Sequence, residues 1–213
     1  MSINEKDENS ISVKVVMIGS VGVGKSSIIA RYVRNLFNEK NEPTIGANFS
    51  TKELLYNKKR VILNIWDTAG QEKFRSMGRL FYKNANIIVM VYDITKQDSF
   101  DDIKNYWYKD VKENGENYKV IGIVGNKIDL YEKEEIDNKQ IKEFIEQINN
   151  DKKTKITEKK VSCLNGVNIN ELFNDLVSLY FSEDFNLLLK EDSRENEVKI
   201  NQEDKKRGKR KCC

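Results

Sequence analysis

The chain alternates between short apolar runs and segments in which apolar residues recur every three or four positions. The first pattern is typical of buried strands, and the second of helices that bury one face. Strands are predicted at residues 13–18, 47–56, 60–66, 87–92, 120–125 and 156–161, and helices from about residue 25, after residue 75, and at about 99–111, 138–148 and 168–180. This alternation predicts βαβ units and a mostly parallel sheet with both faces covered. The two strands on either side of Asn57 predict an antiparallel hairpin at one edge.

The same pattern predicts one folded domain over residues 12–182, with disordered segments at 1–11 and 183–213. No run approaches the ~18 apolar residues that a membrane-spanning helix needs, and the polar start predicts no secretory signal. Two of the three cysteines are the last two residues, which predicts a reducing cytosolic setting and no disulfide framework. The net charge of +3 argues against a nucleic-acid partner, while six basic residues among residues 205–211 point to an acidic surface.

A glycine-rich segment follows the first predicted strand. Residues 19–26, GSVGVGKS, satisfy the pattern G-x-x-x-x-G-K-[ST]. The glycines let backbone N–H groups turn toward phosphate oxygens, and the next helix directs its positive N-terminus at the same charge. Lys25 can reach the β- and γ-phosphates, and the Ser26 hydroxyl can ligate Mg²⁺. The motif predicts a nucleoside-phosphate site, against the simpler interpretation of a strand–helix turn that binds nothing. It does not select a base, because kinases and ATPases share it.

Residues 126–129, NKID, indicate which base is bound. They directly follow the strand predicted at 120–125. Ligands bind at this carboxyl edge of open α/β sheets. Asp129 can accept hydrogen bonds from N1–H and the N2 amino group of guanine, and adenine offers neither arrangement. The simpler interpretation is an exposed turn capped by Asp129. After a phosphate loop and a buried strand, the motif favours guanine.

The sequence WDTAGQE at residues 66–72 also follows a predicted strand. Asp67 can hold the metal, the Gly70 amide can sense the γ-phosphate, and Gln71 can orient the attacking water. Thr44, in a polar loop, can offer its hydroxyl to Mg²⁺ and its carbonyl to that water. Phe37 can shield the edge of the guanine, although a simple hydrophobic residue at a helix end is an equal interpretation.

In this order and spacing, the three motifs resemble the Ras superfamily of small GTPases over residues 12–180, and within it the Rab family. The Rab resemblance depends on IGANF at 45–49, RLFYKNA at 79–85, YDIT at 92–95, and the terminal Cys212-Cys213. It implies an α/β, P-loop NTPase fold with five helices on both faces of a mostly parallel six-stranded sheet that has one antiparallel edge strand. It also implies binding of GTP, GDP and Mg²⁺, slow intrinsic GTP hydrolysis, and a monomeric switch in vesicle trafficking.

The resemblance assigns site residues to this chain. Metal ligands would be Ser26, Thr44 and Asp67, and catalysis would rest on Gln71, helped by Lys25, Thr44 and Gly70. Residues 38–49 and 70–82 would be switch segments that order around GTP. Nucleotide contacts are expected from Val21, Gly22, Val23, Gly24, Lys25, Ser26, Ser27, Phe37, Pro43, Thr44, Gly70, Asn126, Lys127, Asp129, Ser162, Cys163 and Leu164. The expected effector surface is Ile45, Phe49, Trp66 and Phe81, of which the three aromatic residues would be assigned to the core on residue type alone.

Three departures from the family pattern bear on these assignments. Residues 162–164 are Ser-Cys-Leu where the family has Ser-Ala-Lys, so the Cys163 amide can still meet guanine O6 but Leu164 removes a lysine. Residues 47–48 are Ala-Asn where Rabs often have Val-Asp, which weakens the assignment to a Rab subfamily and its effectors. Val21 lies where Rabs commonly have a small polar residue, beside the attacking water and any inserted arginine. We expect Val21 to slow hydrolysis or to hinder that arginine.

The terminal Cys212 and Cys213 directly follow the basic run. The resemblance implies that both are geranylgeranylated and hold the protein at the cytoplasmic face of an endomembrane, in exchange with the cytosol. Two lipid chains give stable anchoring where one does not, and basic residues add attraction to anionic lipids. Expected partners are effectors, an exchange factor, a GTPase-activating protein and a prenyl-binding chaperone of the escort or GDI type.

Three alternatives remain from the sequence. A hydrolysis-impaired GTP-binding pseudo-switch could act as a scaffold because of Val21, although Gln71 argues against it. An ATP-dependent enzyme with the same phosphate loop is disfavoured by Asp129. A purely structural GTP-binding scaffold would show no difference between its GTP and GDP forms in effector binding.

Overall fold

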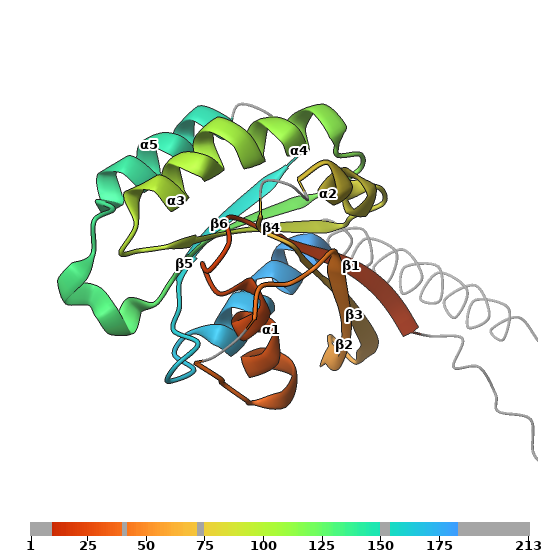
Figure 1. The fold of residues 1–213 in the computed structure, drawn as a ribbon. Coiled ribbons are helices and arrows are strands. Elements are labelled where there is room, and N and C mark those ends of the chain that lie inside the picture. Colours follow the sequence, from red (N-terminus) through yellow and green to blue (C-terminus); the bar gives the residue numbers. More distant parts are fainter. Residues whose placement is uncertain (1–9, 40–41, 72–74, 150–153, 183–213) are drawn as a thin grey trace, which may run out of the picture.

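The computed structural model describes residues 10–39, 42–71, 75–149 and 154–182. Its centre is a six-stranded sheet with the strand order β2-β3-β1-β4-β5-β6. β1 pairs in parallel with β3 and β4, and β5 pairs in parallel with β4 and β6. β2 runs antiparallel to β3 at one edge. The mostly parallel sheet with one antiparallel edge strand is therefore confirmed (Figure 1).

The strands lie close to the predicted positions. Their bounds are β1 Ser10–Ile18, β2 Ala47–Tyr56, β3 Lys59–Thr68, β4 Ile87–Asp93, β5 Val120–Asn126 and β6 Lys155–Lys160. β1 begins earlier than the start of the domain expected at residue 12, because Ser10 and Ile11 already pair with β3. The hairpin between β2 and β3 turns at Asn57 and Lys58, whose φ angles of 48° and 64° are left-handed.

The helices are α1 Lys25–Arg34, α2 Arg75–Tyr82, α3 Gln97–Asp102, α4 Tyr108–Asn114 and α5 Asn138–Ile148. A single π-helical turn, Ile103–Trp107, joins α3 to α4 without a break, so the helix predicted at 99–111 is one continuous rod with a widened turn. A 3₁₀ helix, Ile128–Lys133, follows β5, and residues 169–182 form the last helix that the structure describes.

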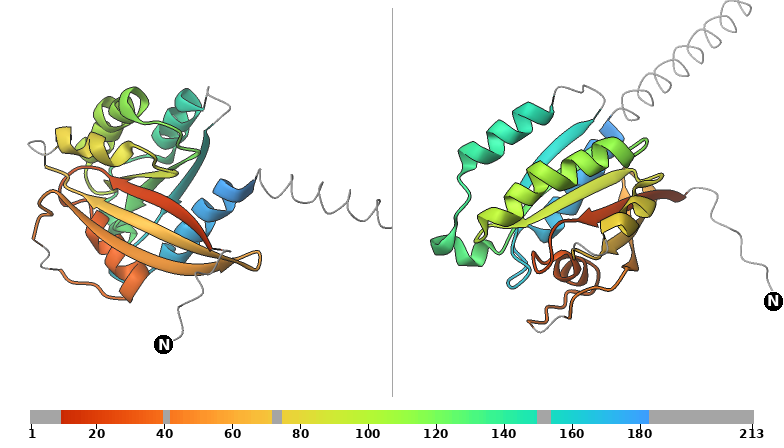
Figure 2. Two further views of the ribbon diagram at one scale, coloured as in Figure 1. Left: turned by 90° about the vertical axis from the view of Figure 1, so that its right-hand side faces the viewer. Right: turned by 45° about the horizontal axis from the view of Figure 1, so that its top comes forward.

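The helices cover both faces of the sheet and enclose two cores (Figures 1 and 2). α1 and helix 169–182 pack on one face, where Tyr32 and Phe173 stack with ring centroids 3.7 Å apart. α2, the α3–α4 rod and α5 cover the other face, around the fully buried Phe100 and Trp107. Within the described ranges, no helix is long and apolar enough to cross a bilayer.

Candidate nucleotide site

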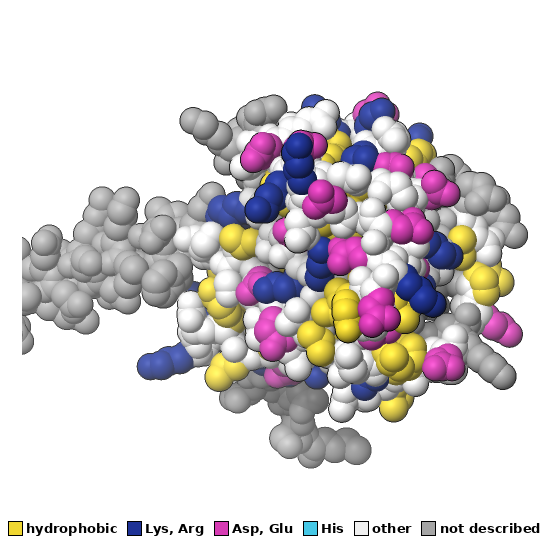
Figure 3. Space-filling view, turned by 90° about the vertical axis from the view of Figure 1, so that its left-hand side faces the viewer, with side chains coloured by type: hydrophobic (Ala, Val, Ile, Leu, Met, Phe, Trp, Pro, Cys, Tyr) yellow, Lys and Arg dark blue, Asp and Glu magenta, His cyan; other side chains and the backbone are white. Residues whose placement is uncertain are grey.

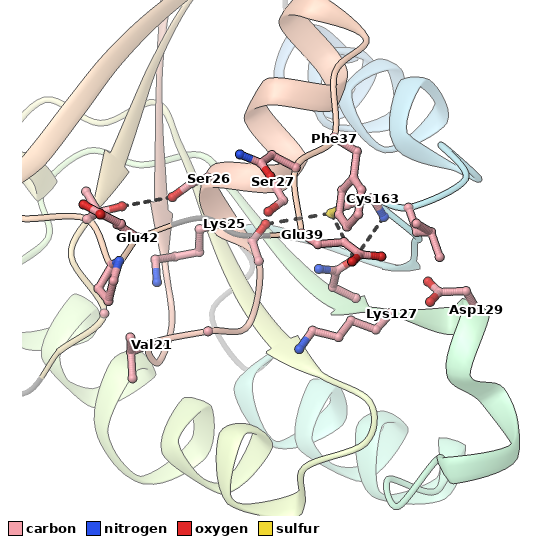
Figure 4. Close-up of a pocket in the computed structure, with 18 of the residues that line it drawn as sticks. Val21, Lys25, Ser26, Ser27, Phe37, Glu39, Glu42, Lys127, Asp129 and Cys163 are labelled. Carbon is pink, nitrogen blue, oxygen red and sulfur yellow. Dashed lines mark hydrogen bonds between the residues drawn. The ribbon is translucent and has the colours of Figure 1, made fainter.

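The functional motifs meet at the carboxyl ends of β1, β3 and β5, around a cavity of about 470 Å³ (Figure 4). α1 and the loop before it form its floor, and its walls are the loop that precedes β2 and the loops that follow β3, β5 and β6. The residues that line it are Val21, Gly22, Gly24, Lys25, Ser26, Ser27, Phe37, Asn38, Glu39, Glu42, Pro43, Thr44, Gly70, Asn126, Lys127, Asp129, Leu130, Cys163 and Leu164.

The phosphate loop has the conformation that its glycines allow. Gly24 has a φ of 98°, and a β-carbon there would lie 2.2 Å from Nδ2 of Asn126, so no other residue fits without displacing the neighbouring wall. Lys25 is 5% exposed, and its ammonium donates to the carbonyl oxygens of Gly19 at 2.7 Å and Ser20 at 3.1 Å. Burial lowers the pKa of Lys25 to about 8, against the opposing attraction of Asp67. The ammonium is thus held inside the loop, where a phosphate would supply its counter-charge.

Three oxygen ligands converge beside Lys25. The Ser26 hydroxyl donates to Oδ2 of Asp67 at 2.6 Å, and Oγ1 of Thr44 lies 3.0 Å from Oγ of Ser26 and 3.2 Å from the same carboxylate oxygen. Oδ1 of Asp67 is buried without a hydrogen-bond partner, and burial is the main cause that raises the pKa of this carboxyl. Two hydroxyls and one carboxylate are the hard oxygen donors that suit Mg²⁺.

Among the described residues, no group of three or more His, Cys, Asp and Glu side chains could hold a metal. The donor set fits an ion that takes its remaining ligands from phosphate and water, as Mg²⁺ does in nucleotide sites.

The loops before β2 and after β3 close over the phosphate loop together. A β-carbon on Gly70 would lie 2.6 Å from the backbone nitrogen of Val21 and 2.6 Å from Nζ of Lys25, so only glycine allows this approach. The backbone N–H of Ala69 donates to the carbonyl of Gly46 at 2.9 Å, which ties one loop to the other. Both loops therefore contact the phosphate end of the cavity and each other.

The opposite end of the cavity carries the base motif. Asn126 is buried, donates from Nδ2 to the carbonyl of Val23 at 2.8 Å, and accepts from the Cys163 amide at 3.3 Å. Lys127 has a left-handed φ of 70°, and its ammonium lies 2.6 Å from Oδ2 of the buried Asp93. These contacts fix the motif to the phosphate loop and to the end of β4.

Asp129 and Cys163 complete the base end. The Ser162 hydroxyl donates to Oδ1 of Asp129, which orients the carboxylate. Burial raises the pKa of the Cys163 thiol to about 12, so at neutral pH this side chain is a neutral, mainly apolar group in the cavity wall. The carboxylate is left as the charged acceptor for the base at this end.

The structure brings most of the predicted nucleotide residues to the cavity, but not all of them. Val23 and Ser162 are buried behind its wall, and Asp67 reaches it only through Ser26 and Thr44. Gln71 is half-buried and does not line the cavity, and residues 72–74 lie outside the described residues. Phe37 lines the cavity, as the shielding interpretation requires, and it also packs against the core as a hydrophobic residue near the end of α1.

Four lining residues were not among the nucleotide contacts predicted from the sequence, although the first three lie in the predicted switch segment 38–49: Asn38, Glu39, Glu42 and Leu130. Leu130 directly follows the base motif, and the other three lie between Phe37 and Pro43, so adjacency was the signal that could have found them. The two glutamates add negative charge to the wall formed by this loop.

The aromatic residues of the expected effector surface form one cluster. Phe49 and Phe81 flank Trp66, with ring centroids 5.1 and 5.2 Å from that of Trp66. Trp66 and Phe81 are half-buried against the core, but Phe49 is 52% exposed and Ile45 is 80% exposed. The core interpretation is therefore wrong for Phe49.

Comparison with known proteins agrees with this geometry. The Ras family model matches residues 14–182. Human Ras-related protein Rab-22A is 36% identical over 174 residues, covering 82% of this chain and 86% of the relative. Human Rab-31 is 37% identical over 163 residues, or 76% and 80% of the two chains, and the GTP-binding protein ypt3 of Schizosaccharomyces pombe is 31% identical over 177 residues, or 83% and 79%. The chain belongs to the Ras family and is a Rab-type small GTPase, which binds GTP or GDP with Mg²⁺ and hydrolyses GTP.

Proposed function

We propose that this GTPase is a switch in vesicle trafficking, whose GTP form recruits effectors to an endomembrane surface. The observation that carries the proposal is the joint closure of two loops on the phosphate loop. Thr44 approaches Ser26 from one side and Gly70 approaches Val21 from the other, while the Ala69–Gly46 hydrogen bond joins the two loops. Contacts of this kind can depend on a γ-phosphate and be released by hydrolysis.

The side chains around the phosphates have separate roles in this proposal. Lys25 and the Gly70 amide would stabilise charge on the γ-phosphate, and Gln71, with the Thr44 carbonyl, would orient the attacking water. Ser26, Thr44 and Asp67 would hold Mg²⁺, which neutralises phosphate charge when bound. Asn126, Lys127 and Asp129 would hold the guanine.

The effector surface extends directly from the switch loops. Ile45 and Phe49 follow Thr44 along the chain, and Trp66 and Phe81 lie on either side of Gly70 in sequence. A change in the loops would therefore move or release part of an exposed apolar surface, which is the chemistry that binds a protein partner. Ile45 and Phe49 would provide most of the contact, because they are the most exposed of the four residues.

The first test combines hydrolysis with effector capture. Gln71→Leu is expected to slow single-turnover GTP hydrolysis by about 10²-fold, since it removes the group that orients the water. Gln140→Leu, at an exposed position on α5, should leave the rate unchanged.

Protein loaded with a non-hydrolysable GTP analogue should capture effectors from its own cell extract that the GDP form does not. If the two forms capture the same proteins to the same extent, the switch proposal fails.

The second test concerns Cys212 and Cys213, which lie outside the described residues. Replacing both with serine should move the protein from the membrane fraction to the cytosol, because it removes both proposed lipid chains. Each single replacement should give intermediate, reversible binding, since one chain anchors only marginally. Fractionation of cells that express tagged variants measures the distribution. Retention of the double variant on membranes would contradict lipid anchoring.

A further inference from the structure

Arg31, in the last turn of α1, contacts both walls of the base end of the cavity. Its Nε donates to the carbonyl of Cys163 and its Nη2 to the carbonyl of Leu164, each at 2.8 Å. Its guanidinium carbon lies 6.0 Å from the ring centroid of Phe37, on the other wall. The two backbone carbonyls are thus held by a planar, permanently charged fork that also faces an aromatic ring.

The fork is itself fixed in place. Nη1 donates to the backbone and side-chain oxygens of Asn35, both at 3.2 Å, where Asn35 ends α1 in a left-handed conformation. A β-carbon on Gly166 would lie 3.7 Å from Cδ of Arg31, an ordinary van der Waals distance, so the stem lies beside the loop that follows Leu164. The guanidinium therefore joins the end of α1, Phe37 and the loop at residues 162–166.

The carbonyl contacts have a consequence for the side of the loop that faces the nucleotide. In a planar trans peptide, the N–H points opposite to the C=O of the same unit. Because Arg31 draws the Cys163 carbonyl toward α1, the Leu164 N–H is directed away from α1. The same restraint limits rotation of the turn that carries the Cys163 amide, which already contacts Asn126 at 3.3 Å.

We propose that Arg31 is a positioning residue for guanine: it sets the separation between Phe37 and the turn at residues 163–164 and so controls how slowly the nucleotide is released. The inference builds on the nucleotide roles proposed above, in which the Cys163 amide meets guanine O6 and Phe37 shields the base. This chain has Leu164 where the family has a lysine, so the turn makes no contact with the base through a charged side chain and depends on its backbone geometry.

The test measures the release of GDP from full-length protein. Arg31→Met keeps an apolar stem but removes both carbonyl contacts, and it should speed the dissociation of ribose-labelled fluorescent GDP about tenfold at saturating Mg²⁺. Arg31→Lys keeps a positive charge but supplies a single ammonium nitrogen and no planar fork, so it should restore part of the slow release. Arg34→Met is the matched control: it removes an arginine from the same helical turn, at an exposed position, and should leave the rate unchanged.

A comparison of GDP with ADP separates a positioning role of Arg31 from a general loss of stability. Adenine has no O6 acceptor but would still contact Phe37, so Arg31→Met should weaken GDP binding by a larger factor than ADP binding and reduce the preference for GDP over ADP. A merely structural role would weaken both nucleotides equally and would overturn the proposal, as would an unchanged GDP dissociation rate.

The Arg31→Lys variant and the unmodified protein decide two further outcomes. Should Arg31→Met fail to fold, as judged by circular dichroism, Arg31→Lys alone must still release GDP at least threefold faster than the unmodified protein, and an unchanged rate contradicts the proposal. If the unmodified protein itself shows no preference for GDP over ADP, the nucleotide roles fail and not the assignment of Arg31 alone.

Discussion

Replacing Asp129 with asparagine should lower the affinity for GDP by at least about 10³-fold, because two N–H donors of the guanine then face a group that accepts only one of them. Asp129 lines the base end of the cavity, and the Ser162 hydroxyl orients its carboxylate. An amide oxygen can still accept from Ser162, so the loop should remain in place. The loss should therefore come from the base contact and not from local unfolding.

The same substitution should create a preference that the unmodified protein lacks. Xanthine has a carbonyl where guanine has its N2 amino group, and the amide NH₂ of D129N can donate to that oxygen. Competition between GDP and xanthosine diphosphate, measured by displacement of a fluorescent nucleotide, should reverse in favour of xanthosine. Asp137→Asn is the control, since asparagine is also a good cap for α5 and the site is remote. Unchanged GDP affinity in D129N would remove the assigned role of Asp129.

Replacing Val21 with glycine should accelerate GTP hydrolysis, by up to about 10³-fold when a GTPase-activating protein supplies an arginine. Val21 is 48% exposed and lines the phosphate end of the cavity. It also lines a second cavity of about 340 Å³, on the side of the phosphate loop formed by residues 95–99 and Asp102. In the proposed nucleotide complex, the isopropyl group would therefore lie at the open approach to the γ-phosphate, where water and an inserted guanidinium would enter.

A graded series distinguishes a steric effect from disturbance of the loop. Val21→Ala removes two methyl groups and keeps backbone stiffness, so its rate should fall between those of the unmodified protein and V21G. Single-turnover hydrolysis is measured with and without the activating protein, and nucleotide affinity is measured in parallel to show that the loop still binds. Equal rates in all three proteins would show that Val21 does not obstruct hydrolysis.

The sequence predicts most helix and strand positions well because the hydrophobic pattern and the turn and cap residues of each element agree with the fold. β2 and α5 have the predicted bounds: β2 ends at a left-handed turn, and Asp137 caps α5 by accepting from Lys139. The start of β1 is harder to predict, since Ser10 and Ser12 are polar and are placed in the sheet by pairing with β3. The π turn at Ile103–Trp107 has no such local signal, because an extra residue in a helical turn changes the phase but not the composition.

The residues of the candidate site also fall into two groups: those that the local sequence predicts, and those that only the tertiary fold brings to the site. Glycines, Lys25 and Asp129 are predictable because their chemistry requires a fixed residue at a fixed spacing. The contacts of Arg31 with two distant carbonyls, and of Lys127 with Asp93, depend on which loops the fold places side by side. Glu39 and Glu42 line the cavity only because their loop folds over it. Tertiary placement of this kind leaves no periodic pattern in the sequence.

The surface that faces the carboxyl ends of the strands, where these loops gather, combines scattered apolar side chains with charges of both signs (Figure 3).

The Ala69–Gly46 bond continues directly into the ladder of β2 and β3, which begins with Ala47 opposite Thr68. The two proposed switch loops thus leave the same end of one stiff two-stranded ribbon and respond as a single mechanical unit. A protein that binds Ile45 alone would report on the proposed γ-phosphate contact at Gly70, and a regulator that displaces either loop would loosen both.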